Sequence, residues 1–344
     1  MIFKQALISL SLAISTATAY HLAVVDQNTK TVRVFPRDAA KWNKDAIYWS
    51  FTADPDVGWF EHDDWADLDD VKIRKTADLG YVALVAASGG KVGMVNIIAG
   101  HESADLDDVV WEATPGDNPH SLERIPHLGA FVASSSDPGK LTLYVPTDAS
   151  DVNNLSKIKK SHEYDLPMAH GVLWHSGKLW ATGKDYLYKF DVVGKGKDIK
   201  LVLDGKEIPL KKIPGHQKNG HDLSASYKDP DVLLLTHTGG AFAYNIKTGE
   251  FKTLMAVTKI KSLVQHSSGE YAWVRGEKNE LGQYVSFSDE KDPKTVTDRR
   301  GWGDAEFYKA KIFDPDYEVQ QPEHYPIVRN AKDLSSGLEK QFME

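Results

Sequence analysis

Short runs of β-branched and aromatic residues, each closed by a Gly, Asp or Asn turn, recur along most of this chain of 344 residues. Helical periodicity is scarce between them, so strand follows strand without helical crossovers. The clearest runs are His21–Asp26, Lys30–Phe35, Tyr81–Ala87, Ala130–Ser134, Leu141–Val145, Lys178–Thr182, Val232–Thr236 and Ala241–Ile246. This pattern is typical of an all-β sandwich, barrel or propeller.

Internal repeats favour the propeller. Four similar segments begin at His120, His170, His221 and Lys261, at intervals of 50, 51 and 40 residues. An earlier copy runs from Val71 to Ala87, with Lys72 near the equivalent start. A period of about 45 residues fits a four-stranded propeller blade. Dividing the 325 residues after residue 19 by that period predicts a seven-bladed β-propeller, with six or eight blades as alternatives. We expect the strand Ala305–Ile312 to close the ring by pairing with Leu22–Phe35.

The chain ends are expected to lie outside this domain. Residues 1–19 have a basic start at Lys4, an apolar run from Ala6 to Ile14 and a small-residue cleavage site at Ala17–Ala19, as in a signal peptide. We therefore predict a secreted protein with one propeller domain over 20–330 and a loosely attached polar tail over 331–344. The sequon at Asn154 agrees with an exported glycoprotein.

Composition removes several classes of function. The formal net charge is −8, and Lys and Arg are nowhere concentrated, so no nucleic-acid partner is expected. The absence of cysteine excludes disulfides, thiolate nucleophiles and Cys-ligated zinc. Apolar runs are too short for a membrane span. A closed propeller is self-sufficient, so we expect a monomer.

The histidines occupy repeat-equivalent positions. In a propeller the first residues of the innermost strands open onto one face, so His120, His170, His221 and Lys261 are expected to surround one funnel, with Asn118 beside them. A cluster of imidazoles and an ammonium group is costly to pack unless something anionic uses it. Lys72 and Arg124 are further candidates for binding that anion.

A sugar acid suits such a cluster. Elimination across C4–C5 of a uronic acid needs a group that neutralises the carboxylate, a base for the C5 proton and an acid for the departing O4. Hydrolysis would need two carboxylates about the bond instead. Acidic residues fall mainly in stretches that look like surface loops, such as Asp63–Asp64 and Asp69–Asp70. The histidines therefore favour a lyase.

Four segments also resemble a known family. They are Gly116–Ser121 with its Asn-Pro-His-Ser sequence, Ala169–Trp174, Gly220–Leu223 and Glu306–Ala310. They resemble, in this order and at blade-like spacing, the propeller family that contains secreted fungal L-rhamnose-α-1,4-D-glucuronate lyases. The resemblance spans most of the chain after the signal peptide. It implies a seven-bladed propeller that removes terminal rhamnose from gum arabic and related arabinogalactans, leaving an unsaturated glucuronate.

The expected roles follow from chemistry and resemblance together. We predict proton transfer by His120, with His170 and His221 as partner acid, base or orienting donor. Asn118 and Lys261 are expected to bind the carboxylate, with Lys72 and Arg124 as further substrate-binding residues. No cofactor is predicted. Two alternatives stay open: a metal-dependent uronate lyase whose histidines hold a divalent cation, and a non-catalytic carbohydrate-binding propeller.

Overall fold

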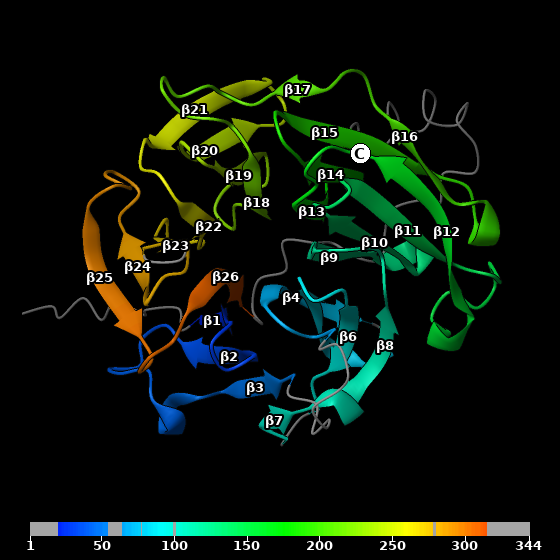
Figure 1. Ribbon diagram of the computed structural model, residues 1–344, viewed down its shortest axis with the longest axis horizontal. Coiled ribbons are helices and arrows are strands. Elements are labelled where there is room, and N and C mark those ends of the chain that lie inside the picture. Colours follow the sequence, from blue (N-terminus) through cyan, green and yellow to red (C-terminus); the bar gives the residue numbers. More distant parts are fainter. Residues whose placement is uncertain (1–19, 54–63, 77, 99–100, 278–279, 315–344) are drawn as a thin grey trace, which may run out of the picture.

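The chain folds into an all-β propeller with six blades arranged around a central axis (Figure 1). The computed structural model describes residues 20–314, apart from 54–63, 77, 99–100 and 278–279. The predicted signal peptide and the predicted tail over 331–344 both lie outside these residues. None of the helices among the described residues is long and apolar enough to cross a membrane.

Each blade is an antiparallel sheet whose strands are stacked one after another from the axis outward. The innermost strands are β26 (Phe307–Phe313), β4 (Leu68–Thr76), β9 (Pro119–Ile125), β13 (Gly171–His175), β18 (Gly220–Ala225) and β22 (Ile260–Gln265). The second strands are β1 (His21–Asp26), β5 (Gly80–Ala87), β10 (Ala130–Ser135), β14 (Lys178–Thr182), β19 (Val232–His237) and β23 (Tyr271–Arg275).

The outer half of each blade has the same plan. The third strands are β2 (Thr31–Pro36), β6 (Val92–Asn96), β11 (Lys140–Pro146), β15 (Tyr186–Val193), β20 (Gly240–Asn245) and β24 (Tyr284–Ser288). The fourth strands are β3 (Trp49–Thr52), β8 (Val109–Ala113), β12 (Ile158–Asp165), β16 (Lys200–Leu203), β21 (Glu250–Met255) and β25 (Val296–Gly301).

Only short elements stand outside this plan in the described part of the chain. Two-residue strands add to the edges of two blades: β7 (Ser103–Ala104) pairs in parallel with β3, and β17 (Ile208–Pro209) pairs with β15. The 3₁₀ turns are η1 (Lys44–Ala46), η2 (Leu106–Asp108), η3 (Pro126–Leu128), η4 (Leu155–Lys157) and η5 (Gly196–Asp198). Asn154 of the predicted sequon precedes η4, and its Oδ1 accepts a hydrogen bond of 2.7 Å from Ser156.

The ends of the described chain close the ring, as the sequence predicts. Strand β26 pairs antiparallel with β1, from His21 opposite Phe313 to Asp26 opposite Phe307. One blade therefore contains β26 together with β1, β2 and β3, the last strand and the first three strands of the described residues. This pairing ties the two ends of the propeller together by main-chain hydrogen bonds.

The prediction of seven blades is wrong, and six is the alternative that the structure confirms. Inner strands begin at Leu68, Pro119, Gly171, Gly220, Ile260 and Phe307, so most blades are longer than the expected period of about 45 residues. Long connections, such as the one between β17 and β18, account for the extra length. In addition, the 325 residues used for the division include 315–344, which lie outside the described residues.

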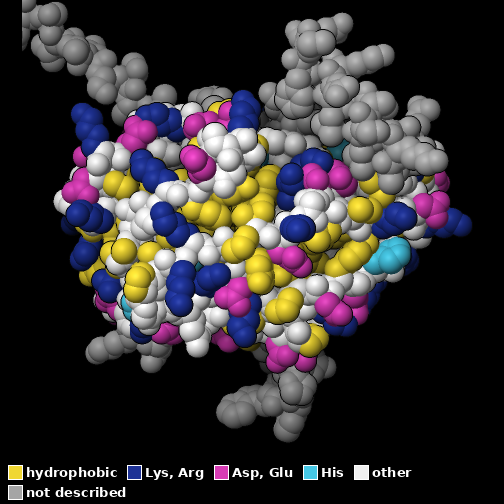
Figure 2. Space-filling model, turned by 90° about the horizontal axis from the view of Figure 1, so that it is seen from above, with side chains coloured by type: hydrophobic (Ala, Val, Ile, Leu, Met, Phe, Trp, Pro, Cys, Tyr) yellow, Lys and Arg dark blue, Asp and Glu magenta, His cyan; other side chains and the backbone are white. Residues whose placement is uncertain are grey.

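The apolar core is divided among the blade interfaces. Six clusters of buried residues lie between successive blades, one cluster for each neighbouring pair. In the first of these clusters, for example, Val25 and Val34 pack with Val71 and Val85 of the next blade. Because strand side chains alternate between the two faces of a sheet, each blade supplies residues to two clusters. On the outer edge of the propeller, both signs of charge are interspersed with apolar side chains (Figure 2).

Burial of His127 on η3 predicts a loss of stability in acid. This imidazole packs against Trp174, with ring centroids 5.4 Å apart, and burial lowers its pKa to about 4. The unfolded chain therefore binds a proton that the folded chain excludes, so stability falls as the pH drops from about 6.5 to about 4. The difference for this group amounts to ~3 kcal/mol.

Thermal unfolding of the wild type and of His127→Gln at a series of pH values checks this prediction. We expect the variant, which cannot titrate there, to lose less stability than the wild type between neutral pH and the acid limit. Parallel pH dependence of the two proteins would contradict the assignment.

Candidate functional site

One end of the central axis gathers a ring of polar side chains. In five of the six inner strands the second residue belongs to the ring, and the sixth member, His170, directly precedes β13. The members, in order around the axis, are Asp69, His120, His170, His221, Lys261 and Tyr308. Because the blades are related by rotation about the axis, equivalent residues meet although they are far apart in sequence.

The three predicted histidines are in mutual contact. The rings of His120 and His170 stack, with centroids 4.1 Å apart and an angle of 12° between their planes. The ring of His221 meets that of His170 edge-on, with centroids 5.4 Å apart. The ring of Tyr308 lies on the other side of His120, with centroids 6.3 Å apart. The structure therefore brings His120, His170 and His221 together as predicted.

A buried carboxylate accompanies His120. Oδ2 of Asp69 lies 3.2 Å from Nδ1 of His120, which is ion-pair distance without the alignment of a hydrogen bond. Gln27 and Ser88 donate hydrogen bonds to the same carboxylate and fix its position. A carboxylate at Nδ1 favours the tautomer with a lone pair on Nε2 and stabilises the imidazolium that forms when Nε2 takes up a proton. His120 is thus equipped as a base.

His170 has a defined tautomer as well. Its Nδ1 donates a hydrogen bond of 2.9 Å to the carbonyl oxygen of Met168, so Nε2 carries the lone pair. Burial, followed by the neighbouring His120 and His221, lowers the pKa of His170 well below its usual value. Burial, followed by the charges of Lys261 and Lys309, does the same to the pKa of His221. Both imidazoles are neutral at neutral pH.

A cation and a phenol complete the ring. Lys261 is 5% exposed, and its Nζ lies 5.7 Å from the ring centroid of Tyr308 and 3.0 Å from Oε2 of Glu280. Burial, followed by the charge of Asp69, raises the pKa of Tyr308 well above its usual value. The phenol therefore keeps its proton at neutral pH and can serve as an acid.

A layer of buried charges lies below the ring. Lys72 pairs with Asp70 at 2.6 Å, and Lys311 pairs with Asp222 at 2.5 Å. Lys309 is fully buried and donates a hydrogen bond of 3.0 Å to the carbonyl oxygen of His120. Buried ionic networks of this kind fix the positions of their members, because removing one partner leaves a charge uncompensated. This layer supports the strands that carry the ring.

The four predicted substrate-binding residues lie in different places relative to the ring. Lys261 is in the ring, and Asn118 lies just before β9, where its amide donates a hydrogen bond of 2.7 Å to Ser136. Lys72 is not at a ring position, because β4 begins at Leu68 and its second residue is Asp69. Arg124 lies near the opposite end of β9 and donates a hydrogen bond to Asn153, so the structure does not bring it to the site.

Two ring members were missed by sequence reasoning. Asp69 and its neighbour Asp70 were expected in a surface-like loop, yet both are nearly fully buried in β4. The burial removes the premise that carboxylates are absent from the site. Asp69 could have been found from its position as the second residue of an inner strand. Finding it requires that β4 be taken to begin at Leu68. Tyr308 holds the same position in β26.

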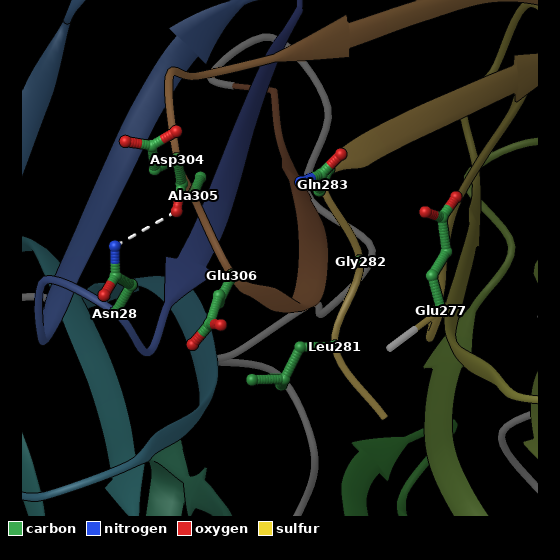
Figure 3. A pocket seen from close by; sticks show the side chains of 8 residues that line it. All are labelled: Asn28, Glu277, Leu281, Gly282, Gln283, Asp304, Ala305 and Glu306. Carbon is green, nitrogen blue, oxygen red and sulfur yellow. Dashed lines mark hydrogen bonds between the residues drawn. The ribbon is translucent and has the colours of Figure 1, made fainter. Parts of the chain in front are cut away.

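A cavity of about 420 Å³ opens where the first and last described blades meet (Figure 3). Its lining comes from the β1–β2 turn, the β23–β24 connection and the segment before β26: Asn28, Glu277, Leu281, Gly282, Gln283, Asp304, Ala305 and Glu306. The β23–β24 connection also carries Glu280, which contacts Lys261 of the ring. The cavity and the ring therefore share one structural element.

The ring does not fit a metal ion. No group of three or more His, Asp or Glu residues suited to a metal is found within residues 20–314 as described. Parallel stacked imidazoles, such as His120 and His170, direct their lone pairs side by side and not toward one point.

Comparison with known proteins agrees on the architecture. Among solved structures the chain is similar to one in a nidogen/laminin complex, with a TM-score of 0.51 and 10% identity over 85% of this chain and 98% of that chain. A functionally unknown protein from Desulfotomaculum acetoxidans gives a TM-score of 0.48 and 12% identity over 90% and 84% of the two chains. Apo AztD from Citrobacter koseri gives a TM-score of 0.44 and 10% identity over 86% and 98%. At such identities only the fold of the first structure bears on this chain.

Sequence comparison gives the family. No curated protein matches the chain. Residues 14–286, which are most of the sequence, match the family of unknown function DUF6528. The chain therefore belongs to the DUF6528 family.

Proposed function

We propose that this protein is a secreted, monomeric polysaccharide lyase that cleaves terminal L-rhamnose-α-1,4-D-glucuronate linkages by β-elimination. Its substrates would be acidic plant polysaccharides such as gum arabic. The observation that carries the proposal is the meeting of three imidazoles, a protonated phenol and a buried ammonium group at one end of the axis. These are the groups that elimination from a uronic acid requires.

The roles follow from the geometry of the ring. His120, oriented by Asp69, takes the C5 proton at Nε2, and Lys261 neutralises the carboxylate so that this proton becomes acidic. Tyr308, adjacent to His120, donates its proton to the departing O4. The C5–H and C4–O bonds then break, and a C4=C5 double bond forms as rhamnose leaves with O4. His170 and His221 orient the sugar through their remaining polar atoms.

The stereochemistry of D-glucuronate at C4 and C5 suits a base and an acid that lie on the same side of the sugar. In D-glucuronate the C5–H bond and the C4–O bond lie on the same face of the sugar ring. A base and an acid can therefore act from one side of the sugar, which is what inner strands that open onto the same end of the axis provide. His120 and Tyr308 belong to β9 and β26, and both present their second residue to the same end of the axis.

Incubation of the secreted protein with gum arabic tests this proposal and separates it from its rivals. Release of rhamnose together with ultraviolet absorbance of an unsaturated uronate, unaffected by a chelator, is the expected result. Rhamnose without that absorbance would indicate a hydrolase, a possibility that the buried carboxylate of Asp69 keeps relevant. Loss of activity with the chelator would indicate a metal-dependent lyase, and no product at all would favour a binding propeller.

A further inference from the structure

We propose that Glu280 is an internal competitor for the substrate carboxylate: it pairs with Lys261 and must be displaced when a uronate binds. This inference rests on the proposed function, since it assigns a residue that sets affinity for the uronate. It differs from that proposal in concerning a residue outside the catalytic ring.

The contact between Glu280 and Lys261 is asymmetric. The Lys261 side chain is 6% exposed, whereas the Glu280 side chain is 54% exposed, and their charged atoms are 3.0 Å apart. Glu280 therefore approaches the buried cation from the solvent side. A substrate carboxylate would have to approach Lys261 from solvent as well, so the two carboxylates would compete for one ammonium group.

The turn that carries Glu280 is shaped to make this contact. Glu280 has a φ of 66°, in the left-handed region that is unfavourable for a residue with a side chain. A Cβ on Gly276 would lie 2.5 Å from the carbonyl oxygen of Glu280, so only glycine allows the turn to close this tightly. The hydrogen bond from Glu277 N to Leu281 O, 2.8 Å long, holds the turn shut.

A second cation holds Glu280 in place. Nζ of Lys259, directly before β22, lies 2.7 Å from Oε1 of Glu280, while Nζ of Lys261 faces Oε2. Hydrogen bonds from Lys259 and then Lys261 lower the pKa of Glu280 to about 2, so it is ionised at every pH at which the protein would work. Because Lys259 remains a partner, Glu280 can release Lys261 without losing every counter-charge.

The same contact explains how the site tolerates a buried ammonium group before a ligand binds. A buried cation without a partner is costly, and a carboxylate of the chain removes that cost until the ligand arrives. The competition favours ligands that carry their own carboxylate over neutral sugars, because a neutral sugar cannot replace the charge of Glu280 at Lys261.

The test compares Glu280→Gln with Glu277→Gln, a neighbour in the same turn that lines the cavity in Figure 3. Calorimetry with sodium D-glucuronate, and with D-glucose as the neutral probe, measures binding to the full-length secreted protein. We expect Glu280→Gln to bind glucuronate about tenfold more tightly and Glu277→Gln to match the wild type. With rhamnosyl-glucuronate, KM should fall about tenfold in Glu280→Gln while kcat stays within about twofold.

Two results would overturn the inference in distinguishable ways. Glucuronate binding that is unchanged or weaker in Glu280→Gln, while the wild type binds and eliminates, would show that Glu280 only positions Lys261. Neither binding nor elimination by the wild type would remove the proposed function and this inference together. Thermal unfolding of both variants checks that they are folded, and Glu280→Ala should change affinity in the same direction as Glu280→Gln.

Discussion

Replacement of His120 by alanine is expected to reduce elimination of rhamnose from rhamnosyl-glucuronate by about 10²–10⁴-fold in kcat. His120 is the imidazole whose Nδ1 faces a buried carboxylate, so we assign its Nε2 as the base. Its loss removes the proton acceptor, and Asp69 cannot replace it from behind. The change in KM should be small, since His170, His221 and Lys261 remain to hold the sugar.

The matched control is His162→Ala. His162 lies on the outer strand β12, where its Nδ1 contacts Ser161, far along the blade from the axis. This variant should keep wild-type activity. Truncation of His120 removes one of the polar groups around the buried Asp69 carboxylate and is expected to lower stability by ~1–3 kcal/mol. His120→Gln, which restores a polar contact, should be more stable yet equally inactive. Near-normal activity in either His120 variant would contradict the assignment.

Replacement of Lys261 by methionine is expected to lower kcat/KM by about 10²–10³-fold on a glucuronate substrate. The buried ammonium group neutralises the carboxylate as negative charge develops at C5, and in a site of low exposure such a charge is worth more than in water. Methionine keeps the length of the side chain but not the charge.

The methyl ester of the same substrate makes this prediction specific. Its carboxylate is already neutral, so Lys261 has no charge to neutralise, and the wild type and Lys261→Met should turn it over at similar rates. Kinetics of acid and ester with both proteins measure the interaction directly. An equal loss on both substrates would mean that Lys261 supports the structure of the site and does not bind the carboxylate.

Much of the fold could be predicted from local pattern. Runs such as Lys178–Thr182 are rich in apolar residues and end at a turn, and the structure has a strand with the same bounds. Ring closure by the last strand also followed from the strand order. Blade number could not be obtained from a mean period, because both the strands and the connections between them vary in length. The spacing of inner strands shows this, with 40 residues separating Gly220 from Ile260 and 52 separating Pro119 from Gly171.

The site could be predicted where the superposed repeats aligned the polar residue with the second position of an inner strand. His120, His221 and Lys261 are second residues of inner strands, so superposing the repeats placed them together. In β4 the superposition was displaced by three residues, which selected Lys72 in place of Asp69. Aspartates at the start of a strand look like a surface turn, because their burial depends on neighbouring blades that sequence does not show. The ion pair between Glu280 and Lys261 depends on a turn with left-handed backbone, which no repeat indicates.

Mass spectrometry of the uronate product from rhamnosyl-glucuronate tests the central claim most directly. Elimination leaves a uronate that is lighter by one water than the product of hydrolysis, because O4 leaves with rhamnose and C5 loses its hydrogen, whereas hydrolysis at the rhamnose C1 leaves both on the glucuronate. We predict that the wild type releases rhamnose with only this lighter product, and that His120→Gln releases neither. A product of full glucuronate mass, or the lighter product formed equally well by His120→Gln, would contradict an elimination carried out by the histidine ring.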